Sequence, residues 1–201
     1  MGTTSPALNG ITRADAWALV TEYVKGESLR RHMLAVEAAM RAYARHWGED
    51  EELWGVTGLI HDFDYEIHPD ADRHPHHGSP ILRARGYPEV VIRALLSHAD
   101  YLDVPRTSRM EKTLYAVDEL TGFITAVALV RPTKAVADVT AQSVRKRMKD
   151  KAFARAVNRE DLLRGAADLG VDFDEHVTFV VRAMTGIAGQ LGLAGVPAAQ
   201  P

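Results

Sequence analysis

Cysteine is absent from the sequence, which excludes disulfide bonds and thiolate metal sites. No run of about 18 apolar residues free of charge occurs, so no segment is predicted to span a membrane. The N-terminal segment MGTTSPALNG lacks the basic stretch and apolar core of a secretory signal peptide. These absences are compatible with a cytoplasmic protein, which is the location that we expect.

A strong charge of either sign is also missing. The formal net charge is -3, which gives no general attraction to nucleic acid or to an anionic membrane. The basic residues are not accompanied by clustered aromatic residues, so neither a nucleic acid nor a membrane is expected as a partner. The sequence leaves a homodimer open.

Helical periodicity dominates what the sequence does contain. With 201 residues, of which 46% are hydrophobic, the chain fits a single domain with a core of ordinary size. No strand pattern, internal repeat or low-complexity tract is evident, so we predict an all-α protein, a single-domain helical bundle. We expect a flexible N-terminus at 1–12, a helical domain at 13–192 and a disordered tail at 193–201.

Capping residues mark the expected helix ends. Thr12 is the predicted N-cap of a first helix over about 13–24, which Gly26 ends. Ser28 is the predicted N-cap of a second helix that runs to Trp47. Further helices are predicted over about 50–62, 79–85, 88–99 and 108–130, and three or four more over 136–192.

Histidines are concentrated in one region of the chain. The sequence has nine, of which six fall between positions 61 and 98. Imidazole is the commonest metal ligand, so metal binding is the first explanation to consider. Residues 63–80, FDYEIHPDADRHPHHGSP, contain three prolines and a glycine and show no period. They predict a long loop of a kind that is often functional.

A carboxylate stands in a helix that is otherwise almost wholly apolar. Asp118 lies in TLYAVDELTGFITAVALV, and helical spacing places Leu114 and Thr121 on its face. A buried charge without a partner costs many kcal/mol, so Asp118 needs one. Metal coordination would supply it, and so would a core arginine, a set of hydrogen bonds or a role as a helix cap.

Several histidines lie at or near helix ends. His61 and Asp62 close the stretch LWGVTGLIHDFD, and adjacent helical residues point about 100° apart. They reach one ion only where the backbone turns or the ion lies at the helix edge, and otherwise form a surface pair or a cap. His32, at the edge of an apolar stripe, and His98, at the end of VVIRALLSHAD, are also compatible with hydrogen-bonded core histidines. The loop histidines are compatible with simple exposure.

Together these residues follow the order H…HD…D along the chain. In this order and in its helical placement, the sequence over about 28–125 resembles the HD-domain superfamily of metal-dependent phosphohydrolases, which are helical. The resemblance implies the metal ligands His32, His61, Asp62 and Asp118. It also implies that a second metal, where present, is held by His74 and His98, with His77 as the alternative to His74. The stretch SHADYLDVPR further resembles a bacterial subgroup described only as HD-domain proteins.

The resemblance also implies a chemistry. The expected cofactor is one or two divalent ions of Fe, Mn, Mg, Co, Ni or Zn. The expected reaction is hydrolysis of a small phosphate ester or nucleotide by a metal-activated water, with His61 and Asp62 as catalytic residues. The expected partner is therefore a small phosphate-containing substrate. Two alternatives stay open, a di-iron oxygenase of the HD fold and a non-catalytic ligand-binding HD domain.

The sequence departs from the family directly after the histidine–aspartate pair. Many members continue with Ile-Gly and then Lys, whereas this chain has Phe63, Asp64 and Tyr65. The lysine that often contacts substrate is therefore absent. Asp64 and Glu66 can serve as acceptors that orient ligand imidazoles, or they can face solvent.

Cationic contacts with a phosphate must then come from elsewhere in the chain. Arg131 and Lys134, in the VRPTK turn after the long helix, are the expected substrate-binding residues. The basic run at 145–151 is a further candidate, and its alternative is a solvated charged helix face.

Overall fold

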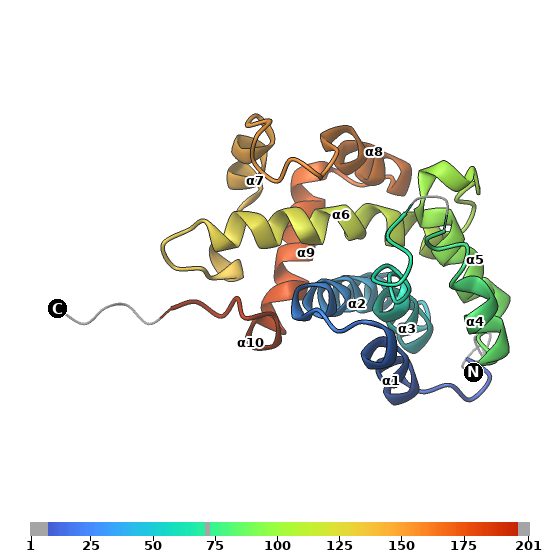
Figure 1. Ribbon diagram of the computed structural model, residues 1–201. Coiled ribbons are helices and arrows are strands. Elements are labelled where there is room, and N and C mark those ends of the chain that lie inside the picture. The colour runs from blue at the N-terminus through green and yellow to red at the C-terminus, as the bar shows by residue number, and fades with distance from the viewer. Residues whose placement is uncertain (1–7, 71–72, 197–201) are drawn as a thin grey trace. The chain divides into compact units, whose positions relative to one another are not determined.

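The structure is a computed structural model that describes residues 8–70 and 73–196 (Figure 1). Within these ranges it consists of helices, turns and one antiparallel β-bridge between Ala135 and Ala194, which confirms the predicted all-α class. The chain divides into two compact units, one up to Tyr115 and one from Ala116 onward. No described helix is both long enough and apolar enough to cross a lipid bilayer.

The first unit is built from helices that precede Ala116. Helices α2 and α3 lie against each other, and α1 packs on α3 (Figure 1). Helix α4 contacts α5, which also reaches α3. The elements are α1 (Arg13–Tyr23), α2 (Glu27–Trp47), α3 (Glu51–Ile60), α4 (Ser79–Ala84), α5 (Glu89–His98), the 3-10 helix η1 (Asp100–Leu102) and the start of α6 (Arg109–Leu129).

The first two helix starts show how far local sequence determines a cap. Thr12 is confirmed as the N-cap of α1, where its hydroxyl accepts from the Asp15 N–H and the Asp15 carboxylate accepts from the Thr12 N–H. The prediction for Ser28 is wrong, because α2 begins at Glu27 with Gly26 as its N-cap. The Glu66 carboxylate accepts from the Lys25 and Gly26 N–H groups at 2.6 and 2.7 Å. The carboxylate of Glu66, a loop residue 40 positions further along the chain, thus accepts from the backbone N–H groups at the start of α2.

A close approach of α2 and α3 positions the end of α3. At Gly58 a Cβ atom would lie 2.9 Å from the Met40 Cγ and 3.1 Å from the Val36 carbonyl oxygen. Any larger residue would therefore push the two helices apart. Met33, Val36 and Met40 on the apolar side of α2 are fully buried, as is Ile60 on α3. Residue 61 is consequently held beside α2.

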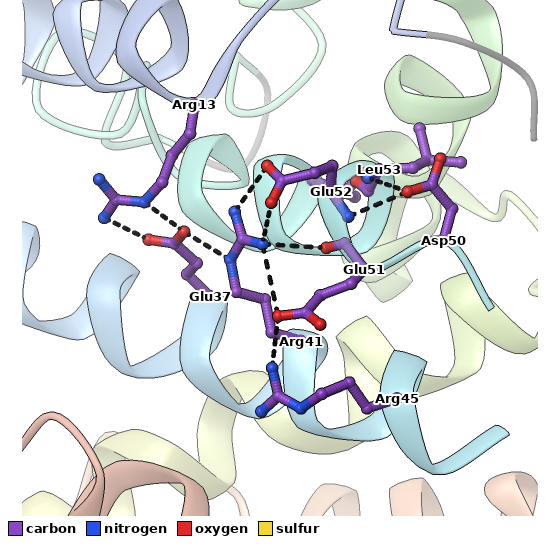
Figure 2. A network of polar contacts seen from close by, with 9 residues as sticks. Arg13, Glu37, Arg41, Arg45, Asp50, Glu51, Glu52 and Leu53 are labelled. Atoms are coloured by element: carbon purple, nitrogen blue, oxygen red, sulfur yellow. Dashed lines mark hydrogen bonds and ion pairs between the residues drawn. The ribbon is translucent and has the colours of Figure 1, made fainter. Parts of the chain in front are cut away.

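Buried charge links the first three helices. The Glu37 side chain on α2 is only 5% exposed and accepts from Arg13 at 2.6 and 2.8 Å and from Arg41 at 2.9 Å. Arg41 continues to the Glu52 carboxylate at 2.7 and 3.0 Å (Figure 2). A buried carboxylate is tolerated only when it is paired in this way. Glu37 thus joins α1 to α2, and Arg41 joins α2 to α3.

The second unit is organised around α9. This helix contacts α7, α8, α10 and η2. The buried His176 on α9 donates from Nε2 to the Ala116 carbonyl at 3.0 Å, and a Cβ atom at Gly165 on α8 would lie 2.8 Å from the Ala116 Cα. The elements are the remainder of α6, η2 (Val136–Asp138), α7 (Ala141–Met148), α8 (Arg159–Leu169), α9 (Phe173–Thr185) and α10 (Ala188–Leu191).

The described parts of both expected flexible ends contain residues that pack on the folded chain. Leu8 is buried, and the Asn9 side chain donates to the Gly86 carbonyl at 3.0 Å. At the other end Leu193 is buried, and its carbonyl accepts from the Val136 N–H at 2.9 Å. An apolar residue in each segment explains why these parts, 8–12 and 193–196, are attached. Residues 1–7 and 197–201 lie outside the described residues.

The Glu37 network predicts unequal costs for its two acidic ends. Glu37→Ala leaves Arg13 and Arg41 without their buried partner, and we expect a loss of about 3 kcal/mol in the free energy of unfolding. Glu52→Ala removes a carboxylate that is 62% exposed, and we expect a loss of at most about 1 kcal/mol. Urea unfolding of the two variants measures both values. Equal losses would contradict the buried role of Glu37.

Candidate metal centre

Two of the expected ligands lie at the ends of helices. His61 is the C-cap of α3, and His98 is the last residue of α5. Carbonyl groups in the last turn of a helix have no partner within the helix. The Nδ1–H of His61 donates to the Gly58 carbonyl at 2.8 Å, and that of His98 donates to the Leu95 carbonyl. With Nδ1 occupied, each ring presents Nε2 as an acceptor.

One oxygen of Asp62 faces a first pair of imidazoles. Its Oδ2 lies 3.3 Å from the His61 Nε2 and 3.8 Å from the His32 Nε2. The two imidazole rings meet edge to face with their centroids 5.1 Å apart. His32 is on α2, and the close packing of α2 on α3 brings it to the end of α3.

The other oxygen of Asp62 faces a second pair. Its Oδ1 lies 3.1 Å from the His74 Nε2 and 3.6 Å from the His98 Nε2. His74 comes from the loop and is 4% exposed. Its ring centroid is 5.4 Å from that of His98. A single carboxylate therefore separates two pairs of imidazole nitrogens.

Asp64 holds His74 in place. Its Oδ1 accepts from the His74 Nδ1–H at 2.7 Å, and Asp64 is fully buried. The fit depends on Gly78, since a Cβ atom there would lie 2.5 Å from the Asp64 Oδ2. Of the two roles left open for Asp64 and Glu66, Asp64 orients an imidazole and Glu66 instead holds the start of α2.

Tyr101 is a further support that the sequence did not suggest. Its hydroxyl donates to the His74 backbone carbonyl at 2.8 Å, from 27 positions further along the chain. The Tyr65 and His74 rings also lie edge to face, with their centroids 5.3 Å apart. Both tyrosines are about half exposed. No local pattern connects them with His74, so only the fold could reveal these contacts.

The pKa shifts follow from this arrangement. Burial by itself raises the pKa of Asp62, but the charges and hydrogen bonds of His61, His74 and His98 outweigh burial and hold that pKa well below its ordinary value. Burial lowers the pKa of His74, but its bonds to Asp62 and Asp64 prevail and raise it to about 9. Without a metal, a proton on His74 therefore supplies part of the positive charge that these carboxylates require.

The donor set fits a divalent metal. One atom from each of His32, His61 and Asp62 lies within 4.8 Å of the others, and the same holds for Asp62, His74 and His98. The Nδ1–H groups of His61, His74 and His98 donate elsewhere, so their Nε2 atoms are acceptors. The carboxylate oxygens are acceptors too, and the two kinds of atom face each other favourably only with a cation or proton between them. Imidazole and carboxylate suit ions such as Fe, Mn, Co, Ni and Zn. Each side of Asp62 has ligands for one ion.

The family comparison agrees with this geometry. Residues 29–122 match the family model of the HD domain. This match supports membership of the HD-domain superfamily, and residues 29–122 are the HD domain of this chain. HD domains are mostly metal-dependent phosphohydrolases and bind divalent metals. No curated protein and no solved structure matches the chain.

The remaining expected residues are His77, Asp118, Arg131 and Lys134. His77 is exposed, and its ring lies 5.2 Å from the ring of His68, so the structure brings His74 rather than His77 to Asp62. Asp118 is half-buried on the part of α6 that belongs to the second unit, and its role as a ligand stays a prediction. Arg131 and Lys134 also belong to the second unit, and their contact with substrate stays a prediction.

Proton release should accompany metal binding to the HD domain. His74 is protonated below pH 9 in the metal-free chain, whereas a ligand imidazole must be neutral, so its proton has to leave. The affinity on this side of Asp62 should therefore rise with pH up to about 9 and then level off. Calorimetry at pH 7.5 in buffers of different protonation enthalpy should give about one more proton released per chain for wild type than for His74→Gln.

His77→Gln is the matched control, because His77 lies in the same loop but away from Asp62. It should release as many protons as wild type. Equal proton release from wild type and His74→Gln would show that His74 is neutral before the metal binds, and would contradict the prediction.

Gly78→Ala should disturb the HD metal centre through Asp64. The added Cβ would lie 2.5 Å from the Asp64 Oδ2 and 2.6 Å from its Cγ, so we expect a destabilisation of about 1–3 kcal/mol and a lower ratio of bound metal to protein. Gly122→Ala is the control, because a Cβ atom there meets nothing within 4 Å. Thermal unfolding and metal analysis test both variants. A normal metal content in Gly78→Ala would contradict the positioning role of Asp64.

Proposed function

We propose that this HD domain hydrolyses a small phosphate ester or a nucleotide with the help of one or two divalent metal ions. The observation that supports the proposal is that the two oxygens of Asp62 face separate pairs of imidazole Nε2 atoms. Such a carboxylate can be shared between two ions. The proposed ligands are His32, His61, Asp62 and Asp118 for one ion and Asp62, His74 and His98 for the other.

The chemistry follows from these ligands. A bound divalent ion lowers the pKa of a coordinated water and so makes hydroxide available near neutral pH. Asp62 lies between the two sides and is placed to take a proton from that water or to orient it. The hydrogen bonds of His61 and His98 to helix carbonyls keep both Nε2 atoms aimed at Asp62 throughout. We propose Arg131 and Lys134 as cations that contact the phosphate of the substrate.

The two groups of ligands, one on each side of Asp62, also suit a second function. Two ions that share a carboxylate and are each held by two imidazoles could be a pair of irons that reacts with oxygen. This oxygenase is the alternative to the hydrolase. It requires two irons per chain and consumption of oxygen, whereas the hydrolase requires release of phosphate without oxygen.

Metal analysis of the purified protein, joined to a screen of phosphate esters with Mn, Mg, Co and Fe, tests the proposal. Asp62→Asn should reduce phosphate release by about a thousandfold, because it weakens both metal sides at once. It should also lower the metal content. His77→Ala, a histidine change outside the centre, should keep both.

Three outcomes would decide against the hydrolase. Full phosphate release and full metal content in Asp62→Asn would show that Asp62 is not a metal ligand. Two irons per chain with oxygen uptake, and no phosphate released from any ester, would favour the oxygenase. A tightly bound nucleotide without turnover at any metal would favour a ligand-binding HD domain.

A further inference from the structure

The second unit has a basic cavity that the metal centre does not explain. It is an open cavity of about 820 Å³ between the turn that follows α6, helix α7 and the start of α9. We call it the α7 cavity. Its charged lining residues are Arg131, Arg145, Lys146, Lys149 and Asp174. None of the ligands proposed for the metal belongs to this lining.

Three of its four cations have no acidic partner among the described residues. Arg145 is paired, since its Nε lies 2.5 Å from the Asp174 Oδ1. In the described parts of the chain, 8–70 and 73–196, Arg131, Lys146 and Lys149 form no ion pair. Unpaired charges of one sign within a concave surface repel one another and raise the local potential. The cavity therefore attracts an anion, whatever the net charge of the chain.

The basic residues of α7 differ in how firmly they are held. The guanidinium of Arg145 lies 4.9 Å from the centre of the Phe173 ring, and that of Arg147 lies 5.0 Å from the centre of the Phe153 ring. Both arginines thus have aromatic contacts that fix them. Lys146 and its C-cap neighbour Lys149 have no such contact with any described residue, and their spacing of three places them on one side of α7. They are the side chains left for a ligand.

The rest of the lining specifies the type of anion. The other lining residues are Thr140, Gln142 and Ser143, which are polar and uncharged. No large apolar side chain is among the lining residues, so an apolar ligand would gain little there. At about 820 Å³ the cavity is many times larger than the roughly 10–15 Å³ of cavity volume that one water requires. A single phosphate would leave most of it to solvent.

We propose that the α7 cavity binds a small anion with at least two phosphate groups. Arg145 is held in place by Asp174 and Phe173 and supplies a fixed guanidinium. The unpaired cations of Arg131, Lys146 and Lys149, which line the same cavity, contact the ligand. Charge-assisted hydrogen bonds from several cations to phosphate oxygens provide the affinity.

Calorimetric titration of the full chain with pyrophosphate and with inorganic phosphate, in a buffer without added divalent metal, tests the site. Pyrophosphate should bind at least about tenfold more tightly than phosphate, because it reaches more of the cations. The double variant Lys146→Ala/Lys149→Ala should weaken pyrophosphate binding by about tenfold or more. Equal affinities for the two anions, or an unchanged affinity in the double variant, would overturn the proposal.

Two controls separate the α7 cavity from other causes. Lys151→Ala/Arg155→Ala removes the same charge from exposed residues outside the lining, and it should change the affinity by less than about twofold. Asp62→Ala, which alters the metal centre, should leave the affinity unchanged. Loss of binding in Asp62→Ala, or equal losses in the two double variants, would overturn the proposal. So would binding of duplex DNA or of phosphatidylglycerol vesicles without binding of pyrophosphate.

The source of the phosphates is distinguished by kinetics. If the anion is part of the hydrolysed substrate, Lys146→Ala/Lys149→Ala should raise KM for the ester found in the screen by about tenfold and leave kcat unchanged. If it is a separate ligand, the same variant should lose pyrophosphate binding but keep both constants. Both results support the site, and they assign it to different ligands.

Discussion

The centre of this protein depends on one electrostatic constraint. The two oxygens of Asp62 face four imidazole nitrogens, at distances between 3.1 and 3.8 Å. The Nε2 atoms of His61, His74 and His98 are acceptors, as the carboxylate oxygens are, unless a proton or a metal ion lies between them. A positive charge is therefore a requirement of the fold itself. The raised pKa of His74 is the response of the metal-free chain to that requirement. A divalent ion on each side of Asp62 meets the same need with ligands that are already in place.

Ordinary helix physics arranges these ligands. Helix ends leave carbonyl groups unpaired, and the ends of α3 and α5 use histidine side chains to satisfy two of them, which also orients the rings. The close approach of α2 at Gly58 positions the end of α3, and the bonds of Arg41 to Glu37 and Glu52 hold the start of α3 on α2. Asp64 accepts from the Nδ1–H of the loop ligand His74 and so orients its ring, as the helix carbonyls do for His61 and His98. The hydrogen bonds that satisfy the ends of α3 and α5 are therefore also the bonds that orient two of the expected metal ligands.

Local signals in the sequence predicted the helical class and the cap at Thr12, because periodicity and capping act over a few residues. They failed at Ser28, since the group that occupies that helix start is Glu66, far along the chain. They could not choose between His74 and His77 either. The choice depends on the contacts with Asp64 and Gly78, which form only when the loop folds back. The resemblance supplied the order of the expected ligands, but not what orients them.

Net charge was a poor guide to the second unit for a related reason. A value of -3 for the whole chain describes an average, and many of the acids that contribute to it are already paired with arginines, as Glu37 and Asp174 are. What attracts a ligand is the charge that remains unpaired at one place. Lys146 and Lys149 are charges of this kind, because the arginines between and beside them already have their aromatic and acidic contacts. An acidic protein can therefore contain a site for a polyanion.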